Sequence, residues 1–133
     1  MGTVYAFFAD GFEEIEGLTV VDLLRRAGIE IDMISINGKK EIEGAHGIRF
    51  QADFDKKEMD FGVLDGGKII REFASSGKLV AAICAAPSVL GAAGILNGKR
   101  ATCYPGFEEK LTDAKTVTEP VVCDGNIITS RGM

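Results

Sequence analysis

Near the middle of the chain the sequence reads Val80-Ala81-Ala82-Ile83-Cys84-Ala85-Ala86-Pro87-Ser88. The apolar run Leu79 to Ile83 predicts a short strand that is buried on both faces. A helix-like pattern follows over residues 86–96, with Pro87 in the first turn, where the missing N–H does no harm. Cys84 therefore lies at a sharp strand-to-helix turn, the kind of turn that presents the serine nucleophile of many hydrolases.

Cys84 is a candidate nucleophile because of what such a turn supplies. Unpaired backbone N–H groups and the positive end of the helix dipole both favour a thiolate over a thiol. The thiolate is the reactive form of cysteine. The alternative is a buried cysteine that fills space, since unpaired cysteine is among the most buried residue types. Spacing by itself leaves both interpretations open.

The composition indicates a single domain that spans residues 1–133. A chain of 133 residues with 46% hydrophobic content can build one core. No apolar run approaches the ~18 residues that span a bilayer, and the start lacks the basic region of a signal peptide, so we expect a cytoplasmic protein without a membrane partner. Fifteen basic and twenty acidic residues give a net charge of -5. We therefore expect no nucleic-acid partner.

The cysteine and histidine counts exclude several kinds of site. The three cysteines are an odd number without C-x-x-C spacing, which indicates neither a disulfide framework nor a structural zinc site. Cys103 and Cys123 stand in apolar stretches typical of strands, and we expect both to be structural. His46 is the only histidine, so a site with two imidazoles is excluded. We expect neither a metal ion nor a cofactor.

Strand-like and helix-like patterns alternate along the chain. A strand over 3–8, an amphipathic helix over 13–27 and a strand over 29–36 would complete a βαβ unit, which implies a parallel sheet. The other expected elements are a hairpin over 39–51, a strand over 59–64, helices over 68–74 and 107–111, and strands over 100–104, 117–122 and 127–130. This order predicts a doubly wound α/β layer fold, in which ligands bind at the carboxyl ends of the strands.

Four motifs resemble the ThiJ/PfpI family, in the branch of the human parkinsonism-associated deglycase. They are Ala9-Asp10-Gly11-Phe12-Glu13-Glu14-Ile15-Glu16, Leu24-Arg25-Arg26-Ala27-Gly28, Ala81-Ala82-Ile83-Cys84-Ala85-Ala86-Pro87 and Thr129-Ser130-Arg131-Gly132. The match extends from Thr3 to the last residue. The resemblance implies a flavodoxin-like, doubly wound parallel sheet sandwich with a nucleophile elbow.

The resemblance also implies a pair of catalytic residues, Cys84 and Glu16. In the family a protonated glutamate from the first helix donates a hydrogen bond to the cysteine sulfur and stabilises the thiolate or its sulfinate. A carboxyl group that is desolvated near a thiolate has a raised pKa, so it can act as a donor. The ordinary alternative for Glu16 is a solvated acid in a first helical turn. Without the resemblance, nothing distinguishes Glu16 from Glu13 or Glu14.

Three further residues match family positions near the site. The backbone N–H groups of Gly67 and Ala85 resemble the family's oxyanion pair. His46 matches a region that the family uses near its dimer interface and its site, so it is a candidate substrate contact, with a histidine in a surface turn as the alternative. Because Ala85 follows Cys84 and no histidine occurs after it, a Cys-His triad is not supported.

Two departures from the family pattern concern the length of the chain. Asp65-Gly66-Gly67 runs straight into Lys68, where the family has a loop and a helix. The sequence also stops at Met133, before the terminal helix of the family. We expect a shortened form of a longer protein, because an elbow without its site loop leaves an apolar face uncovered. The alternative is a divergent member.

The function implied by the resemblance is that of a cofactor-independent enzyme of the glyoxalase III or deglycase type. Its substrates would be reactive carbonyl compounds, namely 2-oxoaldehydes such as methylglyoxal or their adducts with proteins and nucleotides. The alternative is a redox-sensing or chaperone-like stress protein that uses an oxidisable cysteine. A third interpretation is a flavodoxin-like binding module, but the first strand lacks the following Ser/Thr-rich phosphate loop that flavin would need. The resemblance also implies a homodimer.

Overall fold

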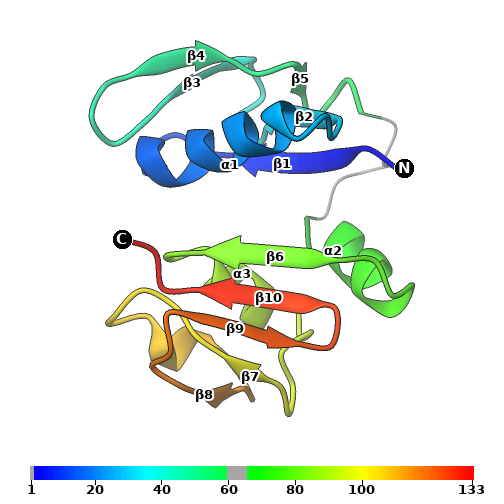
Figure 1. Ribbon diagram of the computed structural model, residues 1–133, viewed down its shortest axis with the longest axis vertical. Helices are drawn as coiled ribbons and strands as arrows, with labels where there is room; N and C mark the ends of the chain where they lie inside the picture. Colours follow the sequence, from blue (N-terminus) through cyan, green and yellow to red (C-terminus); the bar gives the residue numbers. More distant parts are fainter. Residues whose placement is uncertain (1, 60–65) are drawn as a thin grey trace. The chain divides into compact units, whose positions relative to one another are not determined.

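The computed structural model describes residues 2–59 and 66–133. The chain divides into two compact units, Met1–Gly62 (the first unit) and Val63–Met133 (the second unit) (Figure 1). No helix within the described ranges has the length and apolar character needed to cross a membrane. The strand expected over 59–64 falls outside the described residues from position 60 onward.

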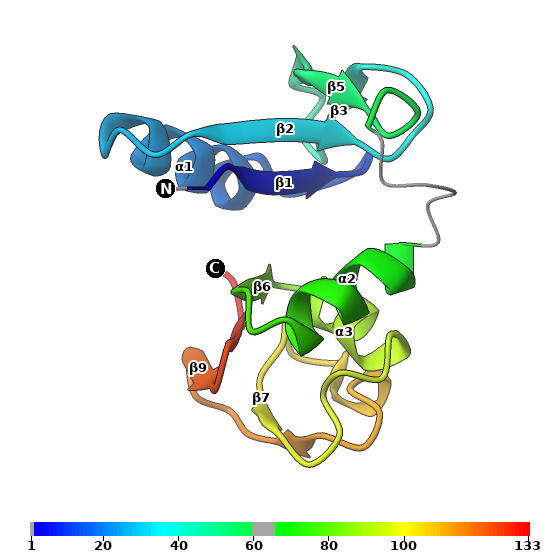
Figure 2. The same cartoon turned by 90° about the vertical axis from the view of Figure 1, so that its right-hand side faces the viewer.

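The first unit confirms the expected βαβ opening. Its elements are β1 (Val4–Phe8), α1 (Glu14–Arg26), β2 (Ile31–Ser35), β3 (Glu41–Glu43), β4 (Arg49–Gln51) and β5 (Phe54–Asp55). Strands β1, β2 and β5 form a parallel sheet in the order β1-β2-β5, and β1 pairs with β2 along its whole length. Helix α1 lies along this sheet (Figures 1 and 2). Acidic residues in its first turn and two arginines in its last turn match the helix dipole.

The expected hairpin is also present, as the antiparallel pair β3 and β4. Its turn is tied to the loop between β1 and α1. The N–H of Gly11 donates to the carbonyl oxygen of Glu43 at 2.8 Å. The N–H of Ala45 donates to the carbonyl oxygen of Phe12 at 2.9 Å. In addition, Asp10 Oδ1 accepts a hydrogen bond from the N–H of Glu43 at 3.0 Å. The hairpin therefore fixes the loop that leads into α1.

Three aromatic rings fill the core beneath this loop. Phe8 lies edge-to-face with Phe12 and Phe50, with ring centroids at 5.0 and 5.3 Å. The rings of Phe12 and Phe50 complete the trio at 5.6 Å. Such pairs contribute about 1 kcal/mol each beyond their burial. The end of β1, the start of α1 and the hairpin thus share one core.

The second unit contains a mixed sheet rather than a wholly parallel one. Its elements are α2 (Gly66–Ser75), β6 (Val80–Ile83), α3 (Pro87–Ala92), β7 (Arg100–Ala101), the 3-10 helix η1 (Glu108–Lys110), β8 (Lys115–Thr116), β9 (Val121–Asp124) and β10 (Ile127–Ser130). In the sheet of order β6-β10-β9, β6 and β10 are parallel, whereas the hairpin β9–β10 is antiparallel. The short strands β7 and β8 form a separate parallel pair.

Several expected boundaries in the second unit are wrong. Of the strand expected over 117–122, only Val121 and Val122 lie in a strand, because β9 begins after Pro120, which has no N–H to donate to a ladder. The strand expected over 100–104 ends at Ala101. Beyond it, the N–H of Thr102 donates to the side-chain Oγ1 of Thr129 at 3.0 Å, which takes the backbone out of the ladder.

The strand and helix that flank Cys84 also differ from the expectation. Within the second unit β6 is an edge strand that pairs with β10, and it is not buried on both faces: Ala81 is exposed and its neighbours are half-buried. Helix α3 ends at Ala92 instead of continuing to residue 96. Gly94, with φ +77°, takes the chain out of the helical conformation shortly afterwards.

A substitution at Gly91 tests the packing of α3 against η1. A Cβ at this position would lie 2.3 Å from the carbonyl oxygen of Lys110, a backbone atom with little freedom to move. We expect Gly91→Ala to lower the free energy of unfolding by about 2 kcal/mol through overpacking, although alanine is the better helix former. Urea denaturation followed by circular dichroism measures this change. Gly2→Ala, with nothing within 4 Å, is the control. Equal stability of the two variants would contradict the packing described here.

Candidate functional site

Cys84 occupies the strained turn that the sequence predicts. Its φ of +64° lies in the left-handed region, which a residue with a side chain enters only when its surroundings hold it there. The N–H of Cys84 donates to the carbonyl oxygen of Ser130 at 3.0 Å, and its own carbonyl oxygen accepts from the N–H of Tyr104 at 2.8 Å. The turn closes as the N–H of Ala86 donates to the carbonyl oxygen of Ile83 at 3.1 Å. The sharp strand-to-helix turn expected at Cys84 is thus confirmed, while the role of its sulfur as a nucleophile stays a prediction.

The three cysteines lie in three different environments. Cys84 is half-buried, Cys103 is buried at 3% exposure, and Cys123 is exposed on β9. Burial raises the pKa of the Cys103 thiol, and the charge of Glu108 raises it further. Cys103 is therefore the structural cysteine that the sequence predicts. Cys123, also expected to be structural, does not fill the core: it is exposed on β9, whereas its neighbour Val122 is buried.

The predicted oxyanion pair consists of the backbone N–H groups of Ala85 and Gly67. Ala85 links Cys84 to α3, and its carbonyl oxygen accepts a hydrogen bond from the Ser88 hydroxyl at 2.6 Å. Pro87 occupies the first turn of α3, as expected. Gly67 lies in the first turn of α2. Both positions belong to the second unit, together with Cys84, and the convergence of their N–H groups stays a prediction.

Glu16 lies in the first turn of α1 and is buried, at 7% exposure. The interpretation of Glu16 as an ordinary solvated acid is therefore wrong. Its N–H and that of Gly17 donate to the carbonyl oxygen of Glu13 at 3.2 and 3.1 Å. A Cβ at Gly17 would lie 2.7 Å from the ring of Phe8, so α1 approaches β1 very closely next to Glu16.

A second buried glutamate, Glu14, was missed by sequence reasoning. Its Oε1 accepts the N–H of His46 at 2.7 Å, and its Oε2 lies 2.8 Å from the imidazole Nδ1 of the same residue. A Cβ at Gly44 would lie 2.2 Å from Oε1, so the carboxylate sits directly on the backbone of the β3–β4 turn. The available signal was the pair of glycines, Gly44 and Gly47, that flanks the sole histidine.

The electrostatics of this pair follow from its hydrogen bonds. Burial by itself would raise the pKa of Glu14, but hydrogen bonds from the His46 ring and from the backbone N–H groups of Glu14, His46 and Ile48 lower it to about 2. The hydrogen bond with Glu14 raises the pKa of His46, and the negative charges of Glu13 and Glu14 raise it further. The predicted role of His46 as a substrate contact therefore competes with an ion pair.

Glu14 and His46, together with Glu13, form a group of side chains in the described ranges that could in principle bind a metal ion. Glu13, Glu14 and His46 offer one ligand atom each, all within 4.8 Å of one another. The distances of Glu13 and Glu14 to His46 Nδ1, 3.3 and 2.8 Å, are those of an ion pair. Because that ion pair accounts for the cluster, the geometry does not assign a metal to it.

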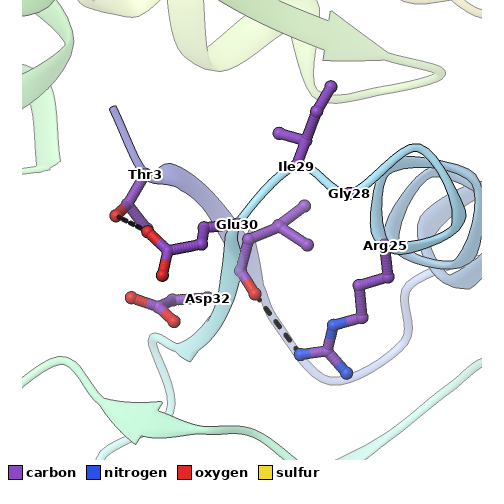
Figure 3. Close-up of a pocket in the computed structure, with 7 residues that line it drawn as sticks. Thr3, Arg25, Gly28, Ile29, Glu30 and Asp32 are labelled. Carbon is purple, nitrogen blue, oxygen red and sulfur yellow. Dashed lines mark hydrogen bonds between the residues drawn. The ribbon is translucent and has the colours of Figure 1, made fainter. Parts of the chain in front are cut away.

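A hollow in the first unit has none of the predicted site residues in its lining (Figure 3). It is lined by Thr3, Arg25, Gly28, Ile29, Glu30, Ile31 and Asp32. Two hydrogen bonds join its lining residues: Thr3 Oγ1 donates to Glu30, and Arg25 donates to the carbonyl oxygen of Ile31, both at 3.3 Å. The hollow lies where β1 and β2 begin, whereas ligands of α/β folds bind where parallel strands end.

The two predicted catalytic residues follow the carboxyl ends of strands. Cys84 comes directly after β6, and Glu16 lies beyond the loop that leaves β1. Cys84, Gly67 and Ala85 belong to the second unit, while Glu16 and His46 belong to the first. Each group is thus placed within its own unit.

Comparison with known proteins agrees with these features. Residues 2–133 match the model of the DJ-1/PfpI family. The chain is 35% identical over 143 residues to a deglycase of Pyrococcus horikoshii, covering 92% of this chain and 86% of that protein. It is 36% identical over 145 residues to DJ-1 homolog B of Arabidopsis thaliana, covering 93% of this chain but 33% of that protein. The chain thus spans about a third of the length of that plant relative.

Solved structures show the same fold. The crystal structure of Drosophila melanogaster DJ-1beta matches with a TM-score of 0.87 at 32% sequence identity, over 98% of this chain and 81% of that one. A structure described as oxidized Toxoplasma gondii DJ-1 matches with a TM-score of 0.89 at 27% identity, over 99% and 83%. The expected α/β, flavodoxin-like fold is therefore confirmed. The match of residues 2–133 to the family model, the shared fold and the turn at Cys84 together show that the chain belongs to the DJ-1/PfpI family.

Proposed function

We propose that the protein is a cofactor-independent cysteine enzyme of the deglycase type, which acts on 2-oxoaldehydes such as methylglyoxal or on their adducts. The observation that carries the proposal is the left-handed backbone of Cys84 at the elbow, where strain is retained to present a side chain. The relatives from Pyrococcus that are named deglycases support the class of activity. The substrate class and the cysteine chemistry are parts of the proposal.

The proposed reaction uses the sulfur of Cys84 as the nucleophile. The thiolate adds to the aldehyde carbon, and the carbonyl oxygen takes a proton from Glu16, which gives a hemithioacetal. For methylglyoxal, a proton then moves from C1 to C2 through an enediol, with Glu16 as base and acid. The aldehyde carbon is oxidised as the ketone is reduced, which yields a thioester. Water cleaves the C–S bond and releases lactate and the thiol. In an adduct of the aminocarbinol type, the Cys84 sulfur forms the C–S bond as the C–N bond breaks, and the amine leaves with the proton of Glu16. The hemithioacetal that results then reacts as above.

This reaction requires that the Glu16 carboxyl lie within hydrogen-bond reach of the Cys84 sulfur. The burial of Glu16 in the first turn of α1 supports such a role, because it places the carboxyl group where little water competes for its hydrogen bonds. The backbone N–H groups of Gly67 and Ala85 would stabilise the negative charge that develops on the substrate oxygen. We also propose a cytoplasmic homodimer. Exposed apolar side chains on α1, those of Ile15, Val20 and Leu23, support a protein partner there.

Removal of the nucleophile tests the proposal directly. We expect Cys84→Ala to abolish the consumption of methylglyoxal, measured by the loss of the dicarbonyl and by the formation of lactate. Cys123→Ala is the matched control, because it removes an exposed thiol from the same unit. Its turnover should equal that of the native protein. Turnover that persists in Cys84→Ala would overturn the proposed function.

The contribution of Glu16 is measured by the reactivity of the cysteine across a range of pH. We expect Glu16→Gln to shift the pH profile of Cys84 alkylation by iodoacetamide, because the amide cannot exchange a proton with the sulfur. Mass spectrometry of the Cys84 peptide measures the rate. Glu109→Gln removes an exposed charge from the second unit and should reproduce the native profile. If Glu16→Gln also reproduces it, Glu16 has no part in the mechanism.

A redox-sensing or chaperone-like stress protein is the alternative function. The oxidized state named for the Toxoplasma gondii relative favours it, since the same half-buried thiolate would react with peroxide. We expect mild peroxide to oxidise Cys84 before the buried Cys103, as measured by peptide mass spectrometry. Selective oxidation of Cys84 together with no aldehyde turnover in the reduced protein would favour the sensor. Turnover in the reduced protein would favour the enzyme.

A further inference from the structure

We propose that Glu14 and His46 are positioning residues: they fix the first turn of α1 against the β3–β4 turn and so set the position of Glu16, more firmly when His46 is charged. The inference rests on the proposed function, in which Glu16 exchanges a proton with Cys84. Neither Glu14 nor His46 needs to touch the substrate. The pair lies entirely within the first unit.

The first step of the argument is that the Glu14 carboxylate has a fitted seat. The side chain of Glu14 is 8% exposed and lies against Gly44, where no Cβ could be accommodated. Its oxygens accept the N–H of His46 at 2.7 Å and meet His46 Nδ1 at 2.8 Å. A weaker contact to the N–H of Ile48 spans 3.5 Å. This seat joins two segments that are 32 residues apart in the sequence.

The second step is that the seat acts on Glu16 through the backbone. Glu14 is the first residue of α1, and Glu16 lies in the same turn. On the far side of Glu16, Gly17 lies against the rings of Phe8 and Phe12, where an added Cβ would come within 2.7 to 2.9 Å of ring atoms. The backbone of Glu16 is therefore held on one side by the hairpin and on the other by the core. Loss of the Glu14 contact would leave the hairpin bonded to the loop before α1 but not to the first turn of the helix itself.

The third step concerns the charges that face His46. Glu13 and Glu14 present carboxylates to Nδ1 at 3.3 and 2.8 Å. On the hairpin, the nearby charges of Glu43 and Arg49 pair with each other at 2.7 Å. The imidazolium is thus attracted by two carboxylates, and these interactions raise the pKa of His46 above 6.5. The attraction is complete below pH 6.5 and is lost as the pH rises through the raised pKa.

Two variants separate the charge of His46 from its hydrogen bond. His46→Asn keeps an N–H donor near the place of Nδ1 but does not titrate. Glu14→Gln keeps the shape of the side chain but removes the negative charge. Because His46 is the only histidine, proton NMR reports its titration from a single set of imidazole signals. We expect a His46 pKa above 6.5 in the native protein and a lower value in Glu14→Gln.

The readout for positioning is the pH profile of Cys84 alkylation. We expect the native profile to show an inflection at the His46 pKa measured by NMR, and His46→Asn to lack it. Glu14→Gln should change the alkylation rate by roughly tenfold at neutral pH, within the range that a displacement below ~1 Å can produce. Glu109→Gln is again the control for the loss of one negative charge. Circular dichroism checks the fold, and His46→Asn decides the question if Glu14→Gln unfolds.

The outcomes distinguish this inference from the proposed function. If Glu16→Gln shifts the profile while His46→Asn and Glu14→Gln leave it native, the positioning role is wrong and the proposed function stands. If Glu16→Gln leaves the profile native, both fail together. A loss of stability in Glu14→Gln without any change in the profile would show a merely structural role, and it would overturn the inference.

Discussion

The left-handed backbone of Cys84 is the constraint on which the arrangement of the second unit depends. A side-chain-bearing residue at φ +64° costs on the order of 1–3 kcal/mol, and the surrounding structure must hold it there. Ser130, at the end of β10, and Tyr104, beyond β7, provide the two backbone hydrogen bonds that do so. The parallel pairing of β6 with β10 brings Ser130 opposite Ile83, next to the elbow. The termination of β7 at Ala101 leaves Tyr104 available to reach Cys84.

In the first unit, a comparable constraint acts on the buried carboxylate of Glu14. Buried carboxylates require partners, and Glu14 satisfies this requirement at the turn of a hairpin rather than within its own helix. The bond fixes the same helical turn that carries Glu16. Glu16 itself is buried beside Gly17, where the helix lies against aromatic rings. The two glutamates therefore have different tasks: one is an ionised anchor, and the other is the proposed proton carrier.

The enzymatic and the redox interpretations of Cys84 use one property of the sulfur. A thiolate that adds to an aldehyde carbon is also the form that peroxide oxidises. The two other cysteines serve as internal references for this property. Cys103 is kept protonated by burial and by the charge of Glu108, and Cys123 is exposed on an antiparallel hairpin without the elbow geometry. A difference in chemistry between Cys84 and these two thiols therefore reports on the elbow and its surroundings.

The sequence by itself determined the βαβ opening, the hairpin over 39–51 and the elbow at Cys84, because periodicity, turn glycines and an early helical proline act over short distances. It misplaced the strand over 117–122, because β9 begins only after Pro120. The tie between Glu14 and His46 was decided only by the tertiary structure. It depends on the approach of Gly44 to α1, and no local pattern specifies which of three neighbouring glutamates a distant turn will meet. The burial of Glu16 was likewise decided only by the tertiary structure, because burial is a property of the packed chain and not of the spacing of residues in the sequence.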